Sequence, residues 1–183
     1  GVDAAMQAWG LVEGRLAGRD RFVAEYLRYQ RAGHRQPGIE GFSLRRIITA
    51  EFRRIGPPSS ATLAVNAATG RVQADRALVS DALHEVLHNA LVHHPEPGTL
   101  DVVVDVAEAN EGRMDLAVYD NGVGIPAAAA DRIFEPYVKL SAAEGSGRYG
   151  LGLAWCRRAL EAAGGYITVR NAKRGACIVI GLP

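Results

Sequence analysis

The sequence has little of what marks a secreted, membrane-spanning or nucleic-acid-binding chain. Only 2 of its 183 residues are cysteines, and they lie far apart, so no disulfide framework is indicated. No apolar run approaches the length of a membrane span, and no basic-then-apolar signal pattern opens the chain. The 21 basic and 20 acidic residues nearly balance, which gives no electrostatic reason to expect nucleic acid or an anionic membrane as a partner.

Apolar residues, by contrast, are plentiful. Hydrophobic residues make up 48% of the chain and charged residues 22%, so a sizeable core can be buried and disorder is not expected. The length suits one ordinary domain with a modest extension. We expect a cytoplasmic location with no membrane contact within these residues, and leave open a membrane anchor upstream of residue 1.

The N-terminal residues 2–31 lack proline and predict one helix, weakened by three glycines. Its apolar residues recur at intervals of three, four or seven, as in an amphipathic helix that needs a partner: Trp9, Val12, Leu16, Val23 and Leu27. Gly33 is expected to end this helix. Residues 34–41, which include Pro37, Gly38 and Gly41, predict a linker.

Beyond the linker the pattern alternates between strand and helix. Helices are predicted over 44–54, 76–93 and 152–163, with Ser43 and Asp75 as the caps of the first two. Strands are predicted over 62–67, 71–74, 100–107, 114–119, 166–170 and 177–181. The sum predicts an α/β fold, a two-layer sandwich whose mixed sheet is covered by helices on one face and preceded by the N-terminal helix.

One candidate binding segment, Asp120-Asn121-Gly122-Val123-Gly124-Ile125-Pro126, follows a predicted strand. Two glycines let the backbone approach a flat ligand closely, while the carboxylate of Asp120 accepts hydrogen bonds from it. Taken alone, such a segment is more often a tight turn capped by its own aspartate.

A second segment, Gly145-Ser146-Gly147-Arg148-Tyr149-Gly150-Leu151-Gly152-Leu153, directly precedes a predicted helix. Backbone amides of a glycine-rich turn at a helix N-terminus suit phosphate. The alternative is a flexible loop before a helix. A P-loop is excluded because no Lys-Ser/Thr pair follows the glycines, and a Rossmann fingerprint fails because no suitable strand leads into Gly145.

The third segment is helical, with Glu85 and Asn89 four residues apart on one face. The carboxylate can act as a base or orient water, and the amide oxygen is a suitable ligand for Mg²⁺. The alternative is a solvated polar face. A zinc-protease pattern, H-E-x-x-H, also runs from His84 to His88. It ranks low because no third ligand has the expected spacing and neither glycine segment is explained.

In this order and spacing, the segments resemble the ATP-binding catalytic domain of two-component sensor histidine kinases. That superfamily (GHKL, with the Bergerat ATP-binding fold) also includes gyrase, a mismatch-repair ATPase and a heat-shock chaperone. The matching stretches are the asparagine box (85–93), the two glycine boxes (120–126 and 147–153) and the phenylalanine box of the ATP lid (132–137). The resemblance covers about residues 42–183, and residues 1–33 resemble the tail of a dimerisation and phosphotransfer helix, joined by the linker 34–41.

The resemblance implies that the chain binds ATP with Mg²⁺. Asn89 would hold the metal, Asp120 would accept the adenine amino group, and Glu85 would be the general base. Gly122 and Gly124 would make room for the base. Further nucleotide contacts are implied for His93, Ile125, Tyr137, Lys139, Arg148, Tyr149, Gly150, Leu151, Gly152 and Leu153. Lys139 and Arg148 are either lid cations for the γ-phosphate or solvated surface charges, and the lid over 127–146 is expected to be mobile and to order around nucleotide.

The implied activity is that of a protein-histidine kinase. It would transfer the γ-phosphoryl group to a histidine outside these residues, for relay to a response regulator, and would form a homodimer through its own dimerisation helices. Two departures leave open a degenerate domain that only binds nucleotide or a partner: Val92 stands where lysine is frequent, and Tyr149 where small residues are usual. A gyrase-like ATPase that uses Glu85 to activate water is a third possibility, although the transducer domain of that branch is missing from the sequence.

Overall fold

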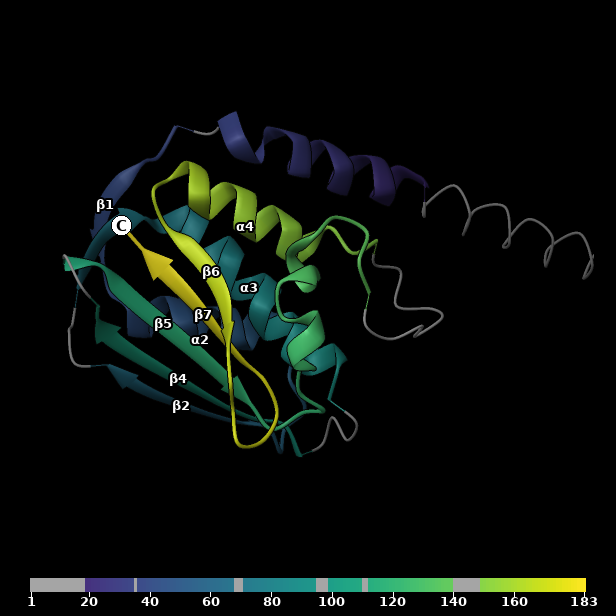
Figure 1. Ribbon diagram of the computed structural model, residues 1–183. Helices are drawn as coiled ribbons and strands as arrows, with labels where there is room; N and C mark the ends of the chain where they lie inside the picture. Colours follow the sequence, from purple (N-terminus) through teal and green to yellow (C-terminus); the bar gives the residue numbers. More distant parts are fainter. Residues whose placement is uncertain (1–18, 35, 68–70, 95–98, 110–111, 140–148) are drawn as a thin grey trace, which may run out of the picture.

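The fold is organised around a five-stranded mixed sheet (Figure 1). The computed structural model describes residues 19–34, 36–67, 71–94, 99–109, 112–139 and 149–183. The strand order is β2-β4-β5-β7-β6, in which β2 and β4 run parallel and every other neighbouring pair is antiparallel. The strands are β2 (Thr62–Ala67), β4 (Asp101–Glu108), β5 (Met114–Asp120), β6 (Tyr166–Arg170) and β7 (Cys177–Leu182). The predicted mixed sheet with late hairpins is confirmed.

Three helices cover one face of this sheet, as predicted (Figure 1). They are α2 (Leu44–Arg54), α3 (Arg76–Val92) and α4 (Gly152–Ala162), and two short 3-10 turns, η4 (Ala127–Ala129) and η5 (Arg132–Phe134), precede α4. A small second sheet pairs β1 (Ile39–Phe42) with β3 (Val72–Asp75). Strand β1 begins within the residues predicted as linker, because its partner β3 is distant in sequence and gives no local signal. No helix among the described residues is long and apolar enough to cross a membrane.

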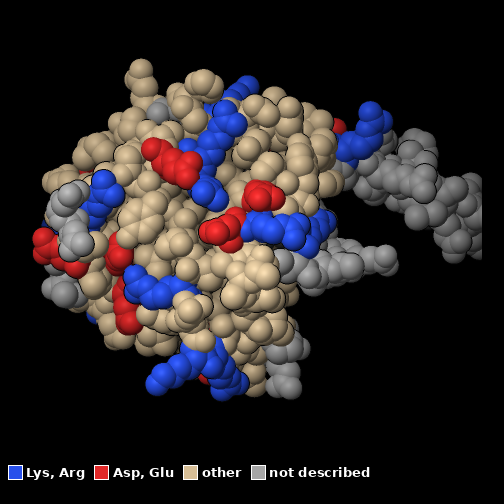
Figure 2. All heavy atoms as spheres, in the orientation of Figure 1, with Lys and Arg blue, Asp and Glu red and all other residues tan. Residues whose placement is uncertain are grey.

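Alternation along the strands separates the core from the outer face. In β4, Val102, Val104 and Val106 are buried toward the helices. On the other face, Asp101 and Asp105 accept hydrogen bonds from Thr62 and Asn66 of β2. Among the described residues on the face drawn in Figure 2, acidic and basic side chains are interspersed. The two cysteines are both buried and are not joined by a disulfide, as expected.

The N-terminal helix is described from residue 19 to residue 31 and ends in the 3-10 turn η1 (Ala32–His34); the predicted residues 2–18 lie outside the described part. It runs beside α4 (Figure 1). Val23 and Leu27, part of the predicted apolar stripe, are 51% and 43% exposed. At these two positions the stripe therefore does not hold the helix to the domain. Its contacts come instead from aromatic and charged side chains.

The two predicted helix caps behave differently. Ser43 occupies the N-cap position of α2, but its side chain makes no capping hydrogen bond, so that prediction is wrong in its mechanism. Asp75 caps α3 as predicted: its Oδ1 accepts from the Leu78 amide at 2.9 Å, and its Oδ2 accepts from the Gly38 amide at 3.2 Å. Because Asp75 is buried, it fixes the start of the helix that carries Glu85 and Asn89.

Replacing Asp75 by alanine should lower the free energy of unfolding by about 2 kcal/mol, because it leaves two backbone amides without their acceptor. Ser43→Ala is the matched control. It changes an N-cap position whose side chain makes no capping bond, and should cost less than about 0.5 kcal/mol. Denaturant unfolding followed by circular dichroism measures both. Equal losses in the two variants would contradict the capping role of Asp75.

Candidate nucleotide site

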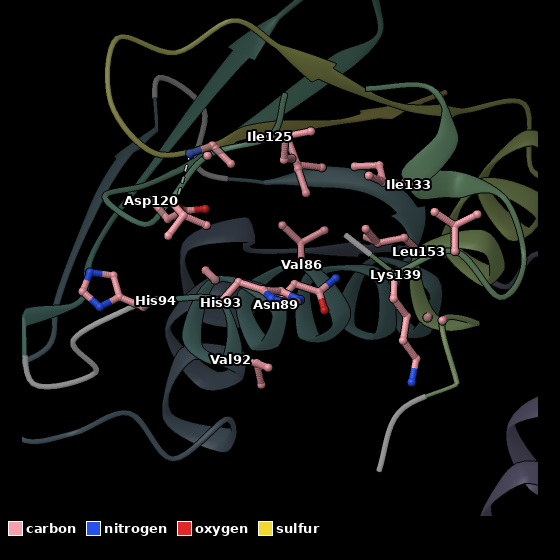
Figure 3. A pocket seen from close by; sticks show the side chains of 18 of the residues that line it. Val86, Asn89, Val92, His93, His94, Asp120, Ile125, Ile133, Lys139 and Leu153 are labelled. Atoms are coloured by element: carbon pink, nitrogen blue, oxygen red, sulfur yellow. Dashed lines mark hydrogen bonds between the residues drawn. The ribbon is translucent and has the colours of Figure 1, made fainter. Parts of the chain in front are cut away.

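A cavity of about 600 Å³ lies between α3, the end of β5 and the start of α4 (Figure 3). Its size is that of a small-molecule pocket. All three predicted segments reach it. Ten of the predicted site residues line the cavity: Asn89, His93, Asp120, Gly124, Ile125, Lys139, Gly150, Leu151, Gly152 and Leu153. Segments distant in sequence thus meet at one place.

The other predicted residues lie elsewhere. Gly122 is not among the residues that line the cavity, and its amide donates to Asp120. The side chain of Tyr137 is exposed, and the ring of Tyr149 contacts the N-terminal helix. Glu85 is turned away from the cavity toward Arg28. Arg148 and the lid residues 140–146 lie outside the described part of the chain, so their predicted charge and mobility stay predictions.

Asp120 is held at the end of β5 by one of its two carboxylate oxygens. Its Oδ1 accepts from the amides of Gly122 at 2.8 Å and Ala176 at 3.2 Å. No described residue donates a hydrogen bond to Oδ2, and the carboxylate projects toward the cavity in Figure 3. The side chain therefore caps its own turn, as the simpler interpretation expected, and still keeps one oxygen for a donor on a ligand.

The connection between β6 and β7 supports this turn, a role that the sequence did not indicate. The Asp120 amide donates to the Ala176 carbonyl at 3.0 Å. Gly175 has φ 65°, and a Cβ there would overlap the backbone oxygen of Asp120. Gly124 has φ 79°, and a Cβ there would lie 2.8 Å from the Gly175 oxygen. The two backbones pack so closely that both positions require glycine.

The residues that flank the predicted lid, Tyr137 and Gly150, are hydrogen-bonded to each other, and we call this junction, with Val138, the neck. The Tyr137 amide donates to the Gly150 carbonyl at 2.9 Å, and both residues have positive φ, 68° and 71°. A Cβ on Gly150 would lie 2.8 Å from the Val138 carbonyl oxygen, so the second glycine segment is needed for this approach as well as for conformation. Helix α4 begins two residues later, and the amides of Gly152 and Leu153 belong to its first turn, where amides lack helical partners.

Apolar side chains that the sequence had not assigned to the ligand form much of the wall. Val86, Ile133, Val138 and Ile178 line the cavity with Ala176. They come from α3, η5, the neck and β7, so no single stretch of sequence displays them as a set. A cavity with apolar walls and a few polar groups suits a flat base attached to a charged tail.

The residues of the H-E-x-x-H pattern serve different neighbours. His84 Nδ1 lies 3.2 Å from Glu51 Oε2 of α2, and Ser80 donates to the other oxygen of that carboxylate. Glu85, by contrast, accepts from Arg28 of the N-terminal helix. His84 and Glu85 thus face different elements. Among the described residues, no group of three or more His, Cys, Asp or Glu side chains is placed to hold a metal ion.

Residues 74–183 match the protein family described as Histidine kinase-, DNA gyrase B-, and HSP90-like ATPase. This chain belongs to that family. Its relatives include the adaptive-response sensory kinase SasA of Gloeothece citriformis, 35% identical over 61% of this chain, and the sensor protein PfeS of Pseudomonas aeruginosa, 38% identical over 62% of it. The matches cover 28% and 24% of those relatives, so the chain spans about a quarter of their length.

Solved structures of histidine kinases share the fold. A mycobacterial sensor histidine kinase, MprB, superposes with a TM-score of 0.67 at 24% identity, over 80% of this chain and 97% of that one. The histidine kinase ThkA in complex with the response regulator protein TrrA gives 0.68 at 20% identity, over 94% of this chain and 49% of that one. The predicted histidine-kinase type of α/β sandwich is confirmed.

Gly175→Ala should disrupt this candidate site, because the added methyl group collides with the backbone of Asp120. Gly56→Ala is the matched control: its φ is also 65°, but nothing lies within 4 Å of the new Cβ. Both variants carry the cost of positive φ, about 1 kcal/mol, and only the first adds the collision. We expect Gly175→Ala to lose at least about 1 kcal/mol more in denaturant unfolding. Equal losses of stability in the two variants would show that the backbone around Asp120 shifts to accommodate the added methyl group at little cost.

Proposed function

We propose that this chain is the ATP-binding catalytic domain of a sensor histidine kinase. It transfers the γ-phosphoryl group of Mg-ATP to a histidine outside these 183 residues, for relay to a response regulator. One observation carries the proposal: Asn89, Asp120 and the first turn of α4 line a single cavity of about 600 Å³. That combination supplies a ligand for the metal, an acceptor for the base and amides for the phosphates in one place.

The chemistry of the cavity is divided along its length. Asp120 Oδ2 accepts the amino group of adenine, and apolar side chains such as Ile125 and Val86 pack against the base. Lys139 lies toward the other end of the cavity in Figure 3 and contributes a cation for the γ-phosphate. The amides of Gly152 and Leu153 cradle the phosphates. Asn89, between these ends, offers its amide oxygen to Mg²⁺. Bound there, the metal would neutralise charge on the phosphates.

A longer protein and its partners are part of the proposal. SasA and PfeS are named a sensory kinase and a sensor protein, and ThkA is recorded in complex with the response regulator protein TrrA. The N-terminal helix fits the tail of a dimerisation hairpin, because its exposed residues Val23, Tyr26 and Leu27 offer an apolar face to a partner helix. A homodimer formed through such helices, with the catalytic domain in the cytoplasm, completes the proposal.

A degenerate domain that binds nucleotide without catalysis is the second candidate, favoured by Val92. This residue lines the cavity without bringing a charge to the phosphates. Lys139 lines the same cavity and supplies the cation from the lid neck, which favours the kinase. Detection of phosphohistidine with the acceptor helix present would separate the candidates: the degenerate domain binds ATP but forms none.

Asn89→Ala should remove most of the magnesium-dependent gain in ATP affinity, about tenfold or more, since the amide oxygen is the proposed ligand. Asn66→Ala is the matched control, because Asn66 lies on the outer face of the sheet, bonded to Asp105. Isothermal titration of ATP with and without Mg²⁺ measures the effect. Unchanged magnesium dependence in Asn89→Ala would refute the assignment of Asn89.

Asp120→Asn should change the choice of base. An ionised carboxylate only accepts hydrogen bonds, so GTP would set the carbonyl of guanine against it, at a cost of about 1–3 kcal/mol or more. The wild-type chain should therefore prefer ATP at least roughly tenfold. An asparagine retains Oδ1 for the amides of Gly122 and Ala176, so the turn stays capped, but its amide group can donate to guanine. We expect a folded variant that binds ATP more weakly and discriminates little between ATP and GTP.

Competition binding of ATP and GTP to both proteins tests this expectation. Wild-type protein that binds the two nucleotides equally, or a variant that keeps the original preference, would show that Asp120 does not select the base.

A further inference from the structure

Lys139 supplies the positive charge at the phosphate end of the cavity. Among the described residues that line the cavity it is the only lysine or arginine, and Val92 brings no charge. Figure 3 places its side chain at the end of the cavity away from Asp120. A lysine ammonium sits on a flexible four-carbon stem, so its place depends on how the backbone beneath it is held. The turn that holds the backbone of Lys139 therefore bears on the proposed phosphate contact.

A tight turn immediately precedes this lysine. The Val138 amide donates to the Glu135 carbonyl at 3.4 Å, which closes a four-residue turn. Pro136 occupies its second position, and Tyr137 occupies its third with φ 68°. These are features of a type II turn, whose third position needs a positive φ and so favours glycine or asparagine. Tyr137 is the only described non-glycine residue with a positive φ, and it stands where turn chemistry disfavours it.

The backbone of Tyr137, not its ring, contributes to the site. The residue is 53% exposed and does not line the cavity. Its amide, however, donates to the Gly150 carbonyl at 2.9 Å and so forms the neck. Residues 135–137 are exposed, whereas the next two, Val138 and Lys139, line the cavity. The chain therefore turns from the surface into the cavity at the strained residue.

We propose that Tyr137 is a positioning residue for the phosphoryl transfer described above, because its left-handed backbone turns Lys139 into the cavity. The inference deepens the proposed function and rests on the role given there to Lys139. Tyr137 acts through Lys139 and is not a catalytic residue.

Backbone strain makes this turn adjustable. A residue in the left-handed region keeps that conformation only where its surroundings enforce it, and here the neck hydrogen bond does so. A side chain at position 137 that tolerates positive φ should preserve the turn, and one that opposes it should lower the population in which Lys139 faces the phosphates. The identity of residue 137 thus sets how often the cation is in place.

Two substitutions that both remove the ring but differ in backbone preference test the inference on the 183-residue chain. Asparagine accepts a positive φ, whereas β-branched valine opposes it. Tyr137→Val should weaken ATP binding about fivefold, and Tyr137→Asn should stay within about twofold of the wild type. ADP, which lacks the γ-phosphate assigned to Lys139, should bind all three proteins equally. Isothermal titration with Mg²⁺ measures both nucleotides, and a melting curve shows that each variant is folded.

Three results of these titrations would overturn the inference. Unchanged ATP affinity in Tyr137→Val would show that the turn does not matter. Equal losses in Tyr137→Val and Tyr137→Asn would assign the effect to the missing ring. Equal losses of ATP and ADP affinity would show a general disturbance of the site.

Lys139→Met tests whether the turn acts through the cation. In that background Tyr137→Val should cause no further loss of ATP affinity, because the charge that the turn positions is already absent. Lys173→Met is the matched control for the loss of one charge, since Lys173 is exposed and does not line the cavity. In the Lys173→Met background Tyr137→Val should still cost about fivefold. Additive losses in the Lys139→Met background would overturn the inference.

Hydrogen exchange without nucleotide tests the turn apart from ATP binding. Protection of the amides at positions 137 and 138 should fall about fivefold in Tyr137→Val and stay at the wild-type level in Tyr137→Asn. Lost protection with unchanged ATP affinity would refute the positioning of Lys139 and leave the proposed kinase function standing. A wild-type chain that binds neither ATP nor ADP would refute the proposed function, and the inference would fall with it.

Discussion

The site depends most on the hydrogen bonds that fix Asp120 at the end of β5. Its backbone and one carboxylate oxygen are tied to the β6–β7 connection through Ala176, and Gly175 packs against its carbonyl. These groups lie more than fifty residues apart, so the acceptor for a base exists only after the sheet has closed. The site is thereby coupled to the global fold: no partly folded chain lacking β7 can hold Asp120 in this position.

Helix α3 distributes its polar residues among three neighbours. Ser80 and His84 meet Glu51 of α2, Glu85 meets the N-terminal helix, and Asn89 lines the cavity. These polar residues therefore have separate tasks, and the buried cap at Asp75 fixes where the helix that carries them begins. A small rotation of this helix would change the core contact, the ion pair and the cavity together. This shared dependence explains why a mostly buried helix carries so many polar groups.

The sequence predicted the elements of the fold well and the support of the site poorly. Patterns of period two and 3.6 placed β2, α2 and α3 within a residue or two of their bounds. Asp120, Asn89 and Gly150 were found because each belongs to a local motif with a physical reason. Strand β1, the packing of Gly175 and the contact of Arg28 with Glu85 were not predicted. All three join segments distant in the chain, and nothing in the local composition signals such a pairing.

The hydrogen bond between Tyr137 and Gly150 brings the two ends of the predicted lid together at the edge of the domain. Because the residues that flank the intervening stretch are joined to each other, a longer stretch adds to the entropy cost of closing a loop. That term grows slowly, by about 0.6 kcal/mol for each doubling. On this term alone, insertions and deletions between Tyr137 and Gly150 should cost the domain little stability, which leaves the length of this segment open to change during evolution.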